Sequence, residues 1–210
     1  MAIRTWKAAL SYRARRFAAA IPGLAFNRYV LVAARVAALP SGAGAGLSTG
    51  IVPPALAVAA GLADAAAAAW RARQNAVCLG VWRRDMLVGV TWVSEQRFDE
   101  DEVFVRFAPP QSAAWDTGMT IAPEARGGRV FAALWAATRA WAEPKGVRWS
   151  ISRIADYNLA SRRAHARLGA VEIGRVSVVR FGNRQWAGGA APAFARLDSV
   201  RPVVRLHVPE

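Results

Sequence analysis

The sequence predicts a mixed α/β (α+β) fold in which a central, mostly antiparallel twisted sheet is flanked by helices. Two observations carry this prediction. Runs of β-branched and aromatic residues with period-two alternation recur from residue 77 onward, and segments with helical spacing of apolar residues lie before and between them. The chain has 210 residues, 54% of them hydrophobic, which suffices for the core of one globular domain with an appendage.

The first expected element is a basic amphipathic helix over residues 3–21. At about 100° per residue, one stripe of this helix collects the side chains of Ile3, Trp6, Leu10, Ala14, Phe17 and Ile21. Basic side chains flank this apolar stripe or lie off it. Two interpretations are open: the helix docks on the protein's own core, or it lies in the interface of an anionic bilayer, with Trp and Phe in the lipid and Arg toward water.

The next segments are a strand, a loop and a helix. Residues 27–36 are rich in β-branched and aromatic side chains and predict a strand, whereas residues 40–54 are rich in Gly, Ser and Pro without periodicity and predict a loop or linker. Residues 55–74 are rich in Ala, with no breaker except Gly61, so they predict one helix.

Strands dominate the middle of the chain. Residues 77–82 and 86–93 predict a hairpin around the turn at 83–85, and residues 102–107 predict a third antiparallel strand beside it. A fourth strand is expected at 116–121, followed by a turn and a helix over 129–142.

The last elements are a strand, a short helix and another strand. Alternation predicts a fifth strand around 147–151, and residues 171–181 predict the final one. Asn158 is expected to cap the short helix, and Gly169 is expected to end it in a left-handed conformation.

Charge and cysteine content exclude several protein classes. The net charge of +14 comes from 28 basic residues, of which only Lys7 and Lys145 are lysines, a bias that GC-rich coding produces, so we expect no nucleic-acid partner. Cys78 is the one cysteine, which excludes an intrachain disulfide and predicts a buried thiol in a cytoplasmic protein. The sequence contains no apolar run of about 20 residues, no secretory signal and no metal-ligand spacing, so we expect no membrane span and no metal.

The segment 119–134 predicts an anion site. A strand, a turn containing Gly127 and Gly128 and a helix follow one another there, and Arg126 and Arg129 bracket the glycines. Such a turn presents backbone N–H groups and a helix dipole to a phosphate. A tight turn without any ligand has the same pattern, so the context of the segment has to decide.

The segment from Asn158 to Ala170 reads Asn-Leu-Ala-Ser-Arg-Arg-Ala-His-Ala-Arg-Leu-Gly-Ala. Because of this segment and the glycine turn before it, the chain resembles the GNAT superfamily of acyl-CoA N-acyltransferases over residues 55–182. The resemblance implies a GNAT-like fold and an acyltransferase domain at 55–186. Residues 1–54 would then hold the amphipathic helix, a strand and the linker, and residues 187–210 a C-terminal tail.

The resemblance also implies where the donor, acetyl-CoA or a longer acyl-CoA, binds. Thr120 and Ile121 would pair with the pantetheine arm. The loop residues that would hold the pyrophosphate are Arg126, Gly127, Gly128, Arg129 and Val130, and the late helix would add Asn158 and Ser161. Arg129 and Phe131 stand where the family usually has glycines; Arg129 could give a phosphate its side-chain charge instead, and Phe131 would narrow the loop or pack beneath it.

Four further residues are candidates for the chemistry. His165 stands where the family often has a tyrosine that protonates the departing thiolate, and histidine can do this at neutral pH, although a buried structural histidine is an equal alternative. Glu102, in the acidic cluster 99–102, is our candidate for the base or amine anchor, because attack on a thioester requires a neutral amine. The alternative is that these four adjacent acids form a solvated loop. Asp116 is the second choice as base and a substrate-binding candidate. Arg153 could bind an acceptor carboxylate or a CoA phosphate, or it could be an ordinary surface arginine.

These observations predict an acyl-CoA-dependent N-acyltransferase that moves an acetyl or longer acyl group to a primary amine by direct attack. Two alternatives stay open. One is a long-chain N-acyltransferase that acts on a lipid-like, sphingoid-type amine as a peripheral protein of the inner membrane, with the anionic membrane surface as a partner. The other is a non-catalytic GNAT-like binding protein. The sequence leaves a homodimer open.

Overall fold

A computed structural model of the chain describes residues 5–190 and 193–209. They form two compact units that interleave along the sequence. The first unit consists of Met1–Ala33, Asp99–Ala108 and Arg153–Glu210, and the second of Ala34–Phe98 and Pro109–Ser152. Both are mixed α/β with mostly antiparallel sheets, which confirms the predicted fold class. The domain boundaries expected at 54/55 and 186/187 remain a prediction.

The second unit is a sheet with helices. Its strand order is β8-β7-β4-β3-β2, antiparallel except for the parallel pair β7–β8. Its elements are the 3₁₀ turns Val36–Ala38, Pro123–Ala125 and Glu143–Lys145, β2 Ser48–Ile51, α2 Pro54–Ala59, α3 Ala65–Ala72, β3 Val77–Arg83, β4 Met86–Ser94, β7 Ala113–Ile121, α4 Gly128–Ala142 and β8 Trp149–Ala155. The last three residues of β8 belong to the first unit.

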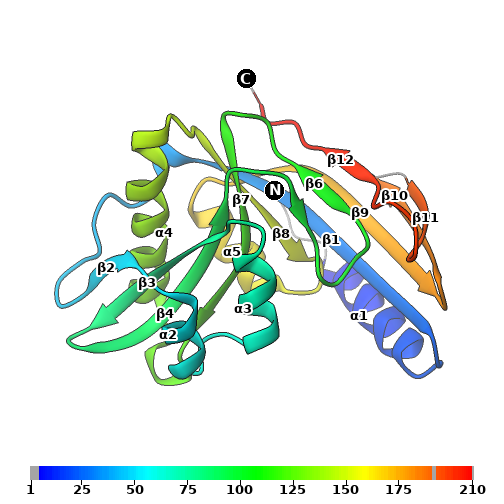
Figure 1. The fold of residues 1–210 in the computed structure, drawn as a ribbon, viewed down its shortest axis with the longest axis horizontal. Coiled ribbons are helices and arrows are strands. Elements are labelled where there is room, and N and C mark those ends of the chain that lie inside the picture. The colour runs from blue at the N-terminus through cyan, green and yellow to red at the C-terminus, as the bar shows by residue number, and fades with distance from the viewer. Residues whose placement is uncertain (1–4, 191–192, 210) are drawn as a thin grey trace. The chain divides into compact units, whose positions relative to one another are not determined.

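The core of this unit lies between α4 and the sheet. Helix α4 packs on β3 and β4, as Figure 1 shows. Its predicted apolar face is confirmed: Val130, Leu134 and Ala137 are buried, and Trp141 packs against the cluster of Leu79, Val93 and Ala137. The predicted hairpin β3–β4 is confirmed as well, with Arg84 at a positive φ in its turn. Cys78 is buried as expected, and burial raises the pKa of its thiol to about 12.

Two predictions about residues 40–74 are wrong. The expected single helix is divided into α2 and α3, because Gly61 adopts a left-handed φ of 68° and the Asp64 carboxylate caps the next helix by accepting bonds from the N–H groups of Ala66 and Ala67. The segment expected to be only a loop contains the edge strand β2, which pairs with β3. A strand of four residues is too short to produce a period-two signal.

The first unit contains the sheet β11-β10-β9-β1, which is antiparallel, and a small sheet of order β12-β6-β5. Its elements are α1 Thr5–Ala19, β1 Leu24–Arg35, β5 Phe98–Asp99, β6 Arg106–Ala108, α5 Leu159–Arg167, β9 Val171–Phe181, β10 Arg184–Gly189, β11 Ala193–Arg196 and β12 Val203–Arg205. The predicted strand 171–181 is therefore confirmed, whereas β10, β11 and β12 were not predicted.

The third hairpin strand, expected at 102–107, is wrong. The partner of β4 is β7, and only residues 106–108 of the segment are in a strand, β6, which pairs in parallel with β12. The acidic cluster explains the difference, because its carboxylates pair with the guanidinium groups of Arg106 and Arg153, and the backbone of this segment does not pair with β4. Burial still alternates along the segment, with Val103, Val105 and Phe107 buried.

Helix α1 docks on its own unit, but not through the predicted apolar stripe. Its contact face holds Ala8, Ser11 and Ala18, all buried, and the hydroxyl of Ser11 donates a 2.5 Å hydrogen bond to Asp156. The stripe faces solvent instead: the exposed fractions are 61% for Trp6, 60% for Leu10 and 71% for Phe17. Ile3 lies outside the described residues. Small residues allow close approach of the helix, and the large apolar side chains remain uncovered by the described part of the chain.

Candidate active site

Strand β7 is distorted where polar groups gather. Trp92 of β4 pairs with Gly118, and the next residue, Val93, pairs with Asp116. Thr117 is therefore an extra residue in β7 and forms a β-bulge. Gly118 follows with a φ of 143°. The bulge turns the strand locally and changes the direction in which its backbone groups point, which is why such irregularities are frequent next to active sites.

Asp116 is the centre of a polar cluster at this bulge. Its carboxylate accepts hydrogen bonds from the Ser152 hydroxyl at 2.9 Å, from the Gly118 N–H at 3.1 Å and from the Thr91 hydroxyl at 3.4 Å. Within the second unit the parallel pairing of β7 and β8 runs from Ala113 to Asp116, whose partner is Ser152. Asp116 therefore marks the last β7–β8 pair of this unit, and the rest of β7 extends beyond it.

The end of β7 leads into the predicted anion turn. Thr120 and Ile121 pair with Val90 and Gly89 of β4, which leaves the opposite edge of the strand for another partner. A 3₁₀ turn follows, and α4 begins at Gly128 with Gly127 as its N-cap residue and no side chain capping it. The first N–H groups of a helix have no acceptor within it, so those of Gly128, Arg129 and Val130 can bind an anion.

The glycines keep this turn open. A Cβ added to Gly127 or Gly128 would meet no atom within 4 Å, and Gly127 has a φ of 154°, which side-chain-bearing residues rarely adopt. Both glycines and Arg126 are exposed. The geometry therefore fits a phosphate group on the N-terminus of α4, approached from outside the turn.

The two residues that depart from the family pattern are positioned by neighbours. The guanidinium of Arg129 donates a 2.6 Å hydrogen bond to the carbonyl of Ala45, which restricts the position of this side chain. The ring of Phe131 packs edge-on against Trp135, with 6.1 Å between the ring centroids. Phe131 thus packs along the helix and not across the turn.

In the first unit, α5 has the predicted caps. The Asn158 side chain accepts a hydrogen bond from the Ser161 N–H at 3.1 Å, and Gly169 has a left-handed φ of 76°. His165 is buried one turn later, and its Nδ1 lies 2.8 Å from the carbonyl oxygen of Ser161. Because a carbonyl only accepts, Nδ1 carries a proton. His165 can therefore give a proton from Nε2 only as the imidazolium.

Arg153 is the centre of a charge network in the same unit. Its guanidinium lies 2.8 Å from the carboxylate of Glu100, which is 3% exposed, and 2.8 Å from that of Glu102. The guanidinium also lies over the ring of Tyr29, 4.2 Å from its centroid, and the Tyr29 hydroxyl donates a 2.7 Å hydrogen bond to Glu102. Arg153 thus serves the network and is not an ordinary surface arginine.

The network sets the protonation states of its members. Burial alone would raise the pKa of Glu102, but the charge and hydrogen bond of Arg153 and the hydroxyl of Tyr29 hold that pKa below its ordinary value. Burial lowers the pKa of Arg153, but the carboxylates of Glu100 and Glu102 outweigh it and raise that pKa. Burial raises the pKa of Tyr29. Glu102 is therefore an anion with little tendency to take up a proton, which suits an anchor for an ammonium better than a base.

The structure brings together only some of the predicted site residues. Glu102 and Arg153 are in contact, and so are Asn158, Ser161 and His165 along α5. Sequence reasoning missed Tyr29 and Glu100. Tyr29 carried no local signal, because it was one aromatic residue in an expected strand, and Glu100 was treated as part of a solvated acidic loop.

Comparison with known proteins identifies a family. Residues 50–171 match the model of the acetyltransferase (GNAT) domain. The fold is similar to that of a protein from Novosphingobium aromaticivorans described as a GNAT-family acetyltransferase, with a TM-score of 0.52, 15% identity, and coverage of 77% of this chain and 68% of that one. A conserved protein of unknown function from Staphylococcus epidermidis gives a TM-score of 0.53 with 13% identity and coverage of 82% and 66%.

A Drosophila protein gives a TM-score of 0.51 with 15% identity and coverage of 82% of this chain and 57% of that one. The chain thus spans about two thirds or less of these structures. No curated protein matches. In residues 5–190 and 193–209, no helix is long and apolar enough to span a membrane, and no three His, Cys, Asp or Glu side chains are grouped to hold a metal ion.

Proposed function

The chain belongs to the GNAT acetyltransferase family, and from this membership we propose that it transfers an acetyl group, or a longer acyl group, from acyl-CoA to a primary amine by direct attack. The observation that carries the proposal is the open glycine turn between β7 and α4. It offers the N–H groups and dipole of a helix N-terminus to the CoA pyrophosphate. Arg126 adds positive charge beside it.

On this proposal the backbone of β7 holds the donor. The free edge of Thr120 and Ile121 pairs with the pantetheine arm, and the irregular backbone at Thr117 directs an N–H group other than that of Gly118, which is bonded to Asp116, toward the thioester carbonyl, where negative charge develops during attack. Asp116 accepts a proton from the amine, directly or through a water molecule. In the first unit, Glu102 is our candidate for the group that anchors an ammonium.

The reaction then needs no covalent enzyme intermediate. The amine nitrogen attacks the thioester carbon, the carbon–sulfur bond breaks, and the thiolate takes a proton. We assign that proton to Nε2 of the His165 imidazolium, whose orientation is fixed by the Nδ1 hydrogen bond to Ser161. Asn158 and Ser161 support this role by forming the first turn of α5.

The proposal is tested by measuring the melting temperature of the full chain with acetyl-, octanoyl- and palmitoyl-CoA, and thiol release with a panel of primary amines. A ligand that binds only the folded state raises the melting temperature. The substitutions Asp116→Asn and His165→Gln should each reduce turnover by about 10² if each group transfers a proton. The absence of both a thermal shift and thiol release would favour the non-catalytic binding protein.

A second candidate function is acylation at a membrane surface. The exposed stripe of Trp6, Leu10 and Phe17 on α1, with arginines beside it, favours a peripheral enzyme that acylates a long-chain amine at an anionic lipid surface. Co-sedimentation with vesicles of anionic lipid tests this, with Phe17→Ser against Phe194→Ser, which removes another exposed ring, 58% exposed, from β11. If Phe17→Ser binds the vesicles as well as the wild-type protein does, the result would count against the membrane-associated function. A cytoplasmic location and a homodimer stay parts of the hypothesis.

A further inference from the structure

A cavity of about 320 Å³ lies beside Glu102 in the first unit. Its walls come from α1, β1, β9 and the acidic segment that precedes β6. The lining residues are Arg15, Ala19, Leu24, Ala25, Phe26, Asn27, Asp101, Glu102 and Arg180. This volume is at the lower end of the range of ligand pockets, about 300–1,000 Å³, so the cavity suits a small molecule.

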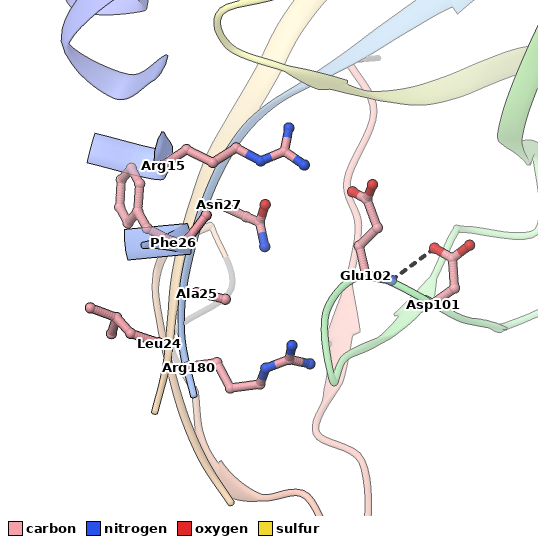
Figure 2. Close-up of a pocket in the computed structure, with 9 residues that line it drawn as sticks. Arg15, Leu24, Ala25, Phe26, Asn27, Asp101, Glu102 and Arg180 are labelled. Carbon is pink, nitrogen blue, oxygen red and sulfur yellow. Dashed lines mark hydrogen bonds between the residues drawn. The ribbon is translucent and has the colours of Figure 1, made fainter. Parts of the chain in front are cut away.

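The charges of this cavity are divided between its walls. Figure 2 shows the side chains of Arg15, Asn27 and Arg180 extending from one side toward Glu102 on the other, with Asp101 behind it. None of the ion pairs in the described part of the chain includes Arg15 or Arg180. A cation and an anion of one ligand can therefore be bound at opposite ends.

The anionic end is built to stay in place. The Glu102 carboxylate is held by the Tyr29 hydroxyl and the Arg153 guanidinium, and the Glu102 N–H donates to the Asp101 side chain at 2.8 Å. Half of the Glu102 side chain is still exposed and free for a ligand. At the cationic end, Arg15 lies over the ring of Tyr157, 5.4 Å from its centroid, and this contact restricts its position.

We propose that this cavity binds the acceptor and selects small amines that also carry a carboxylate, that is, amino acids or similar ampholytes. The ammonium binds Glu102 and Asp101, and the carboxylate binds Arg15 and Arg180. A diamine would place its second ammonium against the two arginines, and a dicarboxylate would place an anion against Glu102. This inference rests on the proposed function, because it gives the amine acceptor a chemical class.

The test is a binding titration of the full chain, without acyl-CoA, by calorimetry. The probes are glycine, 4-aminobutanoate and 5-aminopentanoate, each compared with the alkylamine of the same carbon number. We expect at least one amino acid to bind about 10-fold more tightly than its alkylamine. The chain length with the largest ratio then reports the distance between the two charged ends. A ratio near one for every pair would overturn the proposal.

Variants separate the cavity from the general field of a basic protein. Arg180→Met and Arg15→Met should each abolish the preference for the amino acid over its alkylamine. Arg184→Met, on the exposed strand β10, changes the net charge by the same amount outside the cavity and should keep the preference. An equal loss in Arg184→Met would overturn the proposal, because the effect would then be long-range.

The proposal and the acyltransferase function can fail separately. Thiol release from acetyl-CoA with alkylamines and amino acids alike would support the acyltransferase and overturn the acceptor class. Tight, Arg180-dependent binding of an amino acid without thiol release would support the cavity and count against the acyltransferase. The acyl-CoA titrations use a different ligand, so neither result depends on the other.

Discussion

The two units use different physical means for the same kind of task. In the second unit the proposed binding groups are backbone N–H groups of a turn and a helix N-terminus, which are contiguous in the chain. In the first unit the proposed binding groups are charged side chains that come from α1, β9 and the acidic segment. A backbone site tolerates sequence change as long as the turn persists, whereas a side-chain site depends on each of its members.

This difference predicts different costs for the loss of one residue. Removing a glycine from the turn should affect ligand binding more than folding. Removing the Arg153 guanidinium takes the ion-pair partner at 2.8 Å from a buried carboxylate, and the loss of one member of a buried ion pair is strongly destabilising.

The largest effect is expected for Arg153→Met. The change leaves Glu100, 3% exposed, without its ion-pair partner at 2.8 Å, so the free energy of unfolding should fall by about 3–5 kcal/mol. Urea denaturation followed by tryptophan fluorescence measures it. Adding Glu100→Gln to this variant should restore about half of the loss, because it removes the stranded charge. If the double variant is no more stable than Arg153→Met, the network is not the cause.

A smaller effect, confined to binding, is expected for Gly127→Val in the second unit. A side chain at a φ of 154° on the N-cap residue distorts the turn, so the affinity for acetyl-CoA should fall about 10-fold or more, measured by calorimetry. Gly182→Val is the matched control: its φ of 53° is also strained and its surroundings are equally open, but it lies in the β9–β10 turn. Equal losses of affinity in both variants would mean that strain alone weakens binding.

The same contrast explains how much could be predicted from the sequence. The turn at Gly127, the helix after it and the cap at Asn158 depend on neighbours within a few residues, and a single sequence contains that information. The partner of Glu102 is Tyr29, 73 positions away, and the segment around Glu102 has no ladder to reveal its place. Strand order and the solvent exposure of the α1 stripe depend on tertiary packing, so periodicity predicted many of the elements and one hairpin but not the order of the strands.

A third prediction concerns pH. Burial raises the pKa of Asp156, despite the Ser11 hydroxyl and Arg28 nearby, so the folded state binds the proton more tightly than the unfolded state. Stability contributed by this group therefore falls as pH rises from the ordinary Asp pKa to the raised folded value. Asp156→Asn removes this dependence, so the free energy of unfolding of the variant, relative to wild type, should rise as the pH rises through that window. Urea denaturation at about four pH values between pH 3 and 7 measures it.

The matched control for this pH effect is Asp198→Asn. Hydrogen bonds from Arg196 lower the pKa of Asp198, so its contribution is present above the ordinary Asp pKa and is lost as pH falls through the folded value. The difference between Asp198→Asn and wild type should therefore change with pH in the opposite direction, and only slightly, because the pair is exposed. The same direction of change in both variants would contradict the role of burial at Asp156.

The smallest effect is expected for Arg139→Met, the counterpart of Arg153→Met in the second unit. Arg139 also joins distant segments, since it donates to the carbonyls of Ala37 and Leu39 and pairs with Glu143. Its partners differ from those of Arg153, however: the carbonyls are neutral, and the Glu143 side chain is 48% exposed and can be solvated when the arginine is lost. We expect a loss of about 1 kcal/mol in the same urea assay. A loss equal to that of Arg153→Met would show that bridging distant segments, and not burial of charge, determines stability in both units.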